Sequence, residues 1–543
     1  MIKLNPELYN ANEFQENDFE SGLKGTNTKG VYSTMQFVLR LRDDIHKILD
    51  DKNTTNSSEK VEAFSTYLPE TIHWWQHVGS NIGFIFSMRY PSVAHIAHRD
   101  LKILVSRNEK FKPITKYDQS LPNPHNNDEV NKILNYWHDL RYAYLFILNN
   151  RNIETISKDR QFFLSIGHCF HMLWSSSIQL VSTIVDPQYS FLPNINEWTK
   201  NFQRLESKKE PGFFPDSQTI ISRIGIHAIF EGQARFNQLQ YLAIAAGNKY
   251  TYDDFYDMRM LEVIYFEAFE LFLKSTKIDK PKTLNNSVVA LFLLVCDIAI
   301  NPVDGFPIDI YYYETFIFSN DPGIRFELMC SFIGENKEEW TNAIKDYSAQ
   351  EYIELSDKLT ASMSCFSPYV GAQQVNTWIE KSEAVKKLLE EESKWKFSKE
   401  NLPIRLFFAK YLRIQEDKVK HPNVFCWIGK CMTAEYNYGK DMALVEKLFH
   451  KHKALFIDDV NGEIKPVLFE GYPEENIQET FNDFYTFNTM YDMIVKWIQE
   501  DGEFTYNYKW LSPNEEEATV KEWIRSNFYD QFKIYPEDLI ILK

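Results

Sequence analysis

Long apolar and aromatic segments with helical periodicity dominate residues 62–300, and histidine is their main polar residue. Nine of the chain's 13 histidines lie between His73 and His227, and all of these but His125 fall on segments that the spacing predicts to be helices. Helical bundles place metals and cofactors in cavities lined by such side chains, although histidine is also a common core residue. The sequence therefore predicts a mainly α fold with a multi-helix bundle around a histidine-lined cavity.

The 543 residues are enough for two to four domains. Residues 1–30 are polar and predict an extended N-terminal arm. Residues 31–340 predict the histidine-rich helical domain, which opens with an amphipathic helix over Val31 to Asp50. Residues 341–543 mix helical and strand patterns and predict a smaller α+β domain, with a hairpin near 454–469 signalled by Asn461-Gly462.

Charge and cysteine usage narrow the classes of function. The net charge is −17 and no basic cluster is evident, which disfavours binding to nucleic acid or to an anionic membrane. The longest apolar run, Val288 to Ile300, is too short to span a bilayer. Six scattered cysteines and a polar N-terminus without an apolar signal segment predict a cytoplasmic protein.

Polar and ionisable side chains interrupt an apolar and aromatic segment at Leu68-Pro69-Glu70-Thr71-Ile72-His73-Trp74-Trp75-Gln76-His77. Glu70, His73 and His77 are three and four residues apart, so a helix would present all three on one face. One carboxylate and two imidazoles are suitable ligands for a divalent metal such as zinc. The first hypothesis is therefore a metal site.

The same stretch resembles the zincin metallopeptidases, whose His-Glu-x-x-His motif binds zinc through its histidines and activates water through its glutamate. Glu70 and His73 match the glutamate and the second histidine, but Pro69 replaces the first histidine. Proline cannot bind zinc, although it suits the first position of a helix that begins there. Because only helix is predicted ahead of this motif, the mostly helical peptidases, such as the Taq-type carboxypeptidases, are the nearer analogy.

A second stretch, Ile226 to Arg235, places His227 and Glu231 on one helical face. Its Glu-Gly-Gln-Ala string resembles the segment that supplies the third zinc ligand in glutamate-type zincins, and Gly232 would let the two helices approach closely. A buried Glu231 that pairs with Arg235 or His227 is the alternative, because buried charges need partners.

The leading prediction is a zinc-dependent hydrolase that acts on a peptide or protein substrate. The resemblance implies that His73, Glu231 and His77 hold the metal and that Glu70 is the general base. His227, Tyr241 or Tyr265 would stabilise the oxyanion.

Two further interpretations stay open. Glu70-x-x-His73 is also half of the di-iron signature of ferritin-like bundles, which would make iron the metal. The sequence contains no second Glu-x-x-His, so Glu262, Glu267 and Glu270 would have to supply the missing carboxylates. Alternatively, Pro69 marks a degenerate metal site in a noncatalytic helical scaffold that binds a partner, because loss of a first ligand weakens zinc binding.

Overall fold

The computed structural model of the protein describes Leu4 and residues 30–33, 36–51, 57–122, 126–261, 263–437 and 442–543. The fold is mainly α-helical, as the sequence predicts. The predicted N-terminal arm, except Leu4 and Gly30, lies outside the described residues, as do His125 and Glu262. In the part of the chain that is described, no helix is long and apolar enough to cross a membrane.

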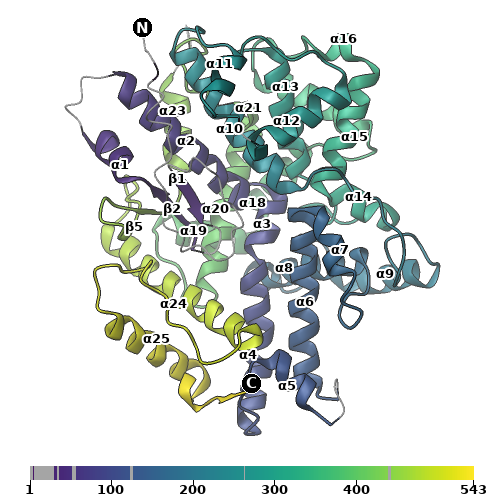
Figure 1. Cartoon of the computed structure of the whole chain (residues 1–543), viewed down its shortest axis with the longest axis vertical. Coiled ribbons are helices and arrows are strands. Elements are labelled where there is room, and N and C mark those ends of the chain that lie inside the picture. Colours follow the sequence, from purple (N-terminus) through teal and green to yellow (C-terminus); the bar gives the residue numbers. More distant parts are fainter. Residues whose placement is uncertain are drawn as a thin grey trace.

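From Asp43 onward, helices follow one another through the described part of the chain (Figure 1). Up to residue 300 they are α1 (Asp43–Asp50), α2 (Ser57–Gly79), α3 (Asn81–Ser87), α4 (Arg89–Ser106), α5 (Ile114–Ser120), α6 (Asp128–Leu148), α7 (Ile153–Ile156), α8 (Ile166–Val185), α9 (Trp198–Ser207), α10 (Ile226–Ala245), α11 (Tyr252–Asp257), α12 (Val263–Thr276) and α13 (Ser287–Ile300). Beyond it they are α14 (Phe316–Asn320), α15 (Pro322–Glu335), α16 (Lys337–Trp340), α17 (Ala349–Ala361), α18 (Pro368–Lys381), α19 (Glu383–Ser393), α20 (Leu402–Lys420), α21 (Pro422–Cys426), α22 (Ile428–Cys431), α23 (Met442–Lys451), α24 (Glu474–Gln499) and α25 (Glu517–Phe532).

Short strands join distant parts of the chain. They are β1 (Gly30–Ser33), β2 (Val38–Leu41), β3 (Phe111–Lys112), β4 (Phe456–Asp458), β5 (Ile464–Pro466) and β6 (Ile540–Ile541). One sheet has the order β1-β2-β4-β5, in which β2 and β4 are parallel and the two outer pairs are antiparallel. The other pairs β3 with β6 in parallel.

The sheet corrects one prediction and confirms another. The amphipathic helix expected over Val31 to Asp50 is wrong, because only α1 is helical and β1 and β2 precede it. The pairing of β2 with β4 supplies hydrogen-bond partners that local periodicity cannot reveal. The hairpin signalled by Asn461-Gly462 is confirmed as β4 and β5, and Gly462 adopts a positive φ of 76° in its turn.

Pro69 lies inside α2 and not at its beginning, which corrects the predicted helix start. A proline in a helix interior removes one backbone hydrogen bond, here to the carbonyl of Ser65, and costs stability. Helix α2 ends at Gly79, because Ser80 is extended and caps α3, where its hydroxyl accepts from the Gly83 amide.

Helix α20 holds the C-terminal end of α2. Gln415 Nε2 and Lys418 Nζ donate to the Gly79 carbonyl oxygen at 2.9 Å and 2.8 Å. This carbonyl belongs to the last turn of α2, where helices lack internal donors and favour positive charge. A Cβ at Gly79 would lie 2.8 Å from the Ile414 side chain, so the two helices meet closely there.

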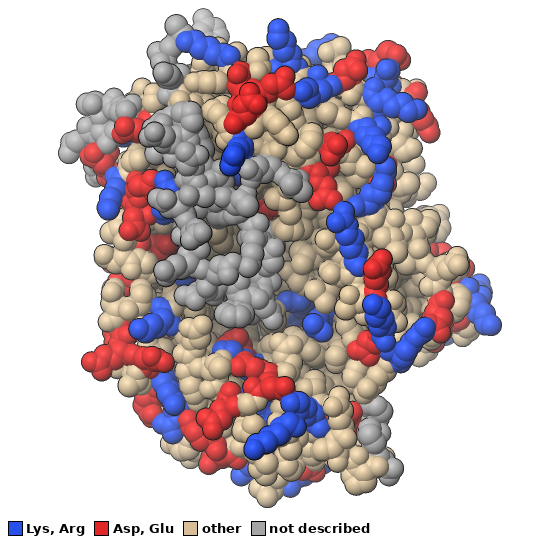
Figure 2. All heavy atoms as spheres, in the orientation of Figure 1, with Lys and Arg blue, Asp and Glu red and all other residues tan. Residues whose placement is uncertain are grey.

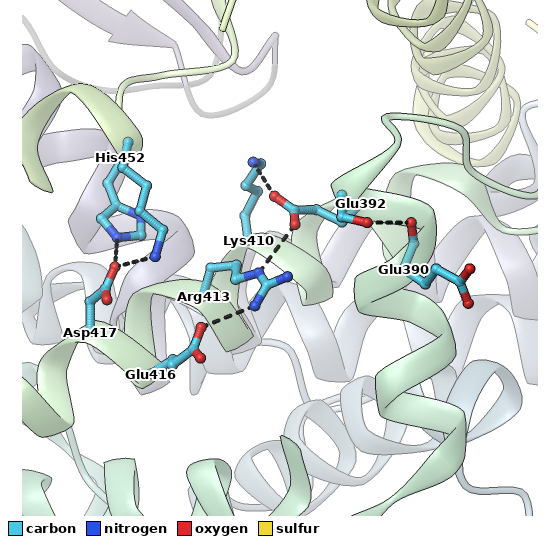
Figure 3. A network of polar contacts seen from close by, with 9 residues as sticks. Glu390, Glu392, Lys410, Arg413, Glu416, Asp417 and His452 are labelled. Carbon is cyan, nitrogen blue, oxygen red and sulfur yellow. Dashed lines mark hydrogen bonds and ion pairs between the residues drawn. The ribbon is translucent and has the colours of Figure 1, made fainter. Parts of the chain in front are cut away.

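A buried network of charges continues along α20 (Figure 3). Asp417 accepts from His452 Nε2 at 2.7 Å and from Lys451 Nζ at 2.6 Å. The carbonyl oxygen of His452 accepts from Trp75 Nε1 of α2 at 2.7 Å. These contacts cross the boundary predicted near residue 340, and the division into two domains stays a prediction.

Charged side chains are spread over the surface. On the face in Figure 2, Lys and Arg side chains of the described residues are interspersed with Asp and Glu. Helix α24, which precedes the last helix α25, packs against α4 and α20, so the C-terminal part of the chain contacts helices from both halves of the sequence (Figure 1).

Candidate acid–base site between α2 and α10

The two stretches that the sequence singles out lie against each other, because α2 packs along α10. Gln76 Nε2 of α2 donates to the Phe230 carbonyl oxygen at 2.9 Å and to Gln233 Oε1 at 2.8 Å on α10. Gly232 does not mediate this approach, which corrects the prediction. A Cβ there would lie 3.1 Å from Phe292 and 3.3 Å from Ala268, so Gly232 faces α13 and α12.

His73 and Glu231 face each other across the two helices. His73 Nε2 lies 3.6 Å from Glu231 Oε1, and both side chains are largely buried. His73 Nδ1 lies 2.7 Å from Gln76 Oε1. The Gln76 amide nitrogen donates its hydrogen bonds to α10, so the amide oxygen faces His73. Because that oxygen can only accept, His73 Nδ1 must carry the proton.

This tautomer has a consequence for the opposite ring nitrogen. With the proton on Nδ1, a neutral His73 presents the lone pair of Nε2 to the Glu231 carboxylate. Two electron-pair donors facing each other at 3.6 Å are stable when a cation, either a proton or a metal ion, lies between them or when one of them is protonated. Gln76 therefore fixes which atom of His73 serves the site.

Glu70 lies on the same face of α2 and is buried, with 8% of its surface exposed. Burial raises the pKa of Glu70 to about 7, and the charge of Glu231 adds to this rise. His73, Arg235 and the backbone N–H of Tyr32, which donates to the carboxylate, oppose the rise without cancelling it. A carboxyl with a pKa near neutrality can both accept and release a proton at physiological pH.

The first strand covers Glu70. A Cβ at Gly30 would lie 2.6 Å from Glu70 Cγ, so only glycine allows β1 to pass this close. A sheet thus precedes the motif, contrary to the prediction that only helix lies ahead of it. Tyr32 was missed by sequence reasoning because it reaches the site through this strand.

His77, predicted as a metal ligand, packs between aromatic rings. Its ring stacks on Tyr32 with centroids 5.6 Å apart and meets Phe230 edge-on at 5.1 Å. Burial, together with the nearby His73, lowers the pKa of His77 to about 3. His77 is therefore uncharged at neutral pH, and its role as a ligand stays a prediction.

The face of α10 adds His227 and Arg235. Burial lowers the pKa of His227 even though Glu231 opposes the shift, and its Nε2 has no hydrogen-bond partner among the described residues. The Arg235 guanidinium carbon lies 3.9 Å from the ring centroid of Tyr265, and its Nη1 donates to Gln238 Oε1 at 2.5 Å. The Nε of Arg235 is likewise buried and unpartnered within the described part of the chain.

The two tyrosines predicted to stabilise the oxyanion, Tyr241 and Tyr265, lie in different surroundings. Tyr265 stacks with Arg235 and its pKa is raised, chiefly by burial. Tyr241 lies farther along α10 against Phe64, with ring centroids 5.3 Å apart. The cluster of Glu70, His73, His227, Glu231, Arg235 and Tyr265 is called the α2–α10 cluster below.

The donor set of the cluster falls short of a complete zinc site. Among the described residues, no group of three or more His, Cys, Asp or Glu side chains is arranged to hold a metal ion. Within the α2–α10 cluster, His73 Nε2 and Glu231 Oε1 approach each other to 3.6 Å. Of the described carboxylates proposed for a di-iron site, Glu267 lies 3.7 Å from Arg151 and Glu270 is exposed.

Comparison with known proteins assigns no relative to this chain. No protein-family model, no curated protein and no solved structure matches it.

Proposed function

We propose that this protein is a hydrolase in which Glu70 accepts a proton from the attacking water and returns it to the leaving group. The observation that supports this most strongly is the pKa of about 7 of Glu70, in a buried cluster with a second carboxylate. Titratable groups shifted toward neutrality by burial and a neighbouring charge are typical of catalytic acids and bases. His227 Nε2 and Arg235 Nε are the unpartnered groups that could bind the developing oxyanion.

A peptide substrate is proposed from the resemblance of Glu70, His73 and Glu231 to the zincin pattern. The test is digestion of a peptide library with the wild-type protein and with Glu70→Gln, with new peptide termini identified by mass spectrometry. Wild type should produce a defined set of cleavages that the variant lacks. A noncatalytic scaffold, which the incomplete donor set favours, would give no cleavage with either protein.

The structure also gives an expectation for zinc. His73 and Glu231 supply two ligands, whereas tight zinc sites use three or four protein ligands. We therefore expect zinc to bind weakly and to be removed by dialysis against a chelator, with less binding still in His73→Ala and Glu231→Ala. Elemental analysis measures this, and zinc retained at one ion per chain after dialysis would show that another ligand completes the site.

A further inference from the structure

A pocket separate from the α2–α10 cluster lies between two loops. One wall is the turn before α8, around residues 157–166, and the other is the loop 212–221 before α10. Its volume of about 570 Å³ is in the range of pockets that bind small molecules. None of its lining residues belongs to the α2–α10 cluster.

The lining combines polar and apolar surface. Phe163, Leu164, Phe214 and Ile221 contribute large apolar side chains. Leu164 and Ile221 remain 46% and 44% exposed, although such side chains gain free energy when they are covered. The pocket therefore offers apolar surface to a ligand with an apolar side chain.

One positive and one negative charge stand side by side at this pocket. Arg160 Nη1 donates to Asp216 Oδ1, which joins the two walls. Both side chains are about three-quarters exposed, at 75% and 72%. An exposed ion pair contributes little stability, so a ligand that supplies both opposite charges can replace it at small cost.

Hydrogen bonds to neighbouring residues hold both walls of the pocket in place. The amides of Gln161 and Phe162 donate to Asp159 Oδ1, each at 3.2 Å, and Asp159 also accepts from the Tyr142 hydroxyl on α6. On the other wall the Gly212 carbonyl oxygen accepts from the Gly167 amide at 2.8 Å. The pocket is thus largely formed before any ligand binds, which lowers the entropic cost of binding.

We infer that this pocket binds a free hydrophobic α-amino acid. Its carboxylate would pair with Arg160, whose planar guanidinium suits two parallel hydrogen bonds, and its ammonium would pair with Asp216. The ammonium and carboxylate groups of an α-amino acid are both bonded to the α-carbon. They are therefore close enough together to pair with two protein charges that are themselves in contact. Its side chain would cover Leu164 and Ile221. This inference does not depend on the proposed hydrolase activity.

The test is titration of the full-length protein with L-leucine by isothermal calorimetry, together with saturation-transfer NMR. Wild type should bind L-leucine, and the affinity should fall about tenfold or more in Arg160→Gln and in Asp216→Asn, because each loses a charge-assisted contact. Arg223→Gln is the matched control, since Arg223 forms a similar surface pair with Glu327 outside the pocket. That control and Glu70→Gln should bind as wild type does.

Derivatives of the ligand test the recognition of both charges. N-acetyl-L-leucinamide carries neither charge and should not bind, and L-aspartate lacks the apolar side chain and should bind much more weakly. Absence of L-leucine binding to the folded wild type would overturn the inference. Equal binding of the uncharged derivative, or of the dipeptide Leu-Leu, would overturn recognition of an α-amino acid.

Discussion

Replacing Glu70 by glutamine should reduce peptide hydrolysis by at least about a hundredfold, because general acid–base groups typically contribute 10²–10⁴-fold. Glutamine has almost the same shape and its amide oxygen can still accept from the Tyr32 amide, but it cannot take a proton from water. Initial rates on a peptide identified from the library measure the loss. Circular dichroism should show an unchanged fold.

The pH dependence of wild-type activity follows from the same group. Glu70 acts as a base in its ionised form, and its pKa is raised to about 7, so the rate should rise as pH increases through about 7. Asp321→Asn is a matched control, because burial also raises the pKa of Asp321 to about 7 at the N-cap of α15, where asparagine can still cap the helix. If Asp321→Asn lowered the rate of hydrolysis as much as Glu70→Gln does, the effect of Glu70→Gln would not be specific to the α2–α10 cluster.

Replacing Glu392 by leucine should lower the free energy of unfolding by about 3–5 kcal/mol, the usual cost of removing one partner from a buried ion pair. Glu392 is 3% exposed and accepts from Lys410 Nζ at 2.8 Å and from Arg413 Nε at 3.1 Å (Figure 3). Burial already lowers the pKa of Lys410, so the lost carboxylate leaves a cation without compensation. Urea denaturation measures the change.

Two variants control for this effect. The double variant Glu392→Leu with Lys410→Met should recover part of the loss, because it removes the stranded ammonium group. Glu383→Leu removes an exposed carboxylate from its pair with Lys386 and should change stability by less than about 1 kcal/mol. Equal effects of Glu392→Leu and Glu383→Leu would contradict a stabilising buried network.

Helices with strong periodicity and clear end signals could be predicted from the sequence. Helix α6 carries both signals, since Asn127 caps its start and its apolar residues recur at regular helical spacing. The Asn461-Gly462 hairpin could be predicted for the same reason, because its turn and its two paired strands are adjacent in the sequence. The first strands were not predictable in this way, because the Leu41 amide donates to Asp458, 417 residues away.

In the candidate site, too, local sequence predicts some features, and contacts between distant residues determine the others. Helical spacing places Glu70 and His73 on one face and His227 and Glu231 on another, and the structure brings these four residues into one cluster. The tautomer of His73 was not predictable, because it depends on Gln76 being held by Phe230 and Gln233 of a distant helix. The pKa of Glu70 depends on burial under β1, which is a tertiary property.

The most direct test of the acid–base site is the titration of Glu70 itself. Carbon-13 NMR of protein labelled at the glutamate carboxyl carbon, compared with the spectrum of Glu70→Gln, identifies the resonance that belongs to Glu70. We expect this carboxyl to titrate with a pKa of about 7. A titration near 4.5, the ordinary value for a glutamate in water, would contradict the proposal that the α2–α10 cluster prepares Glu70 for proton transfer.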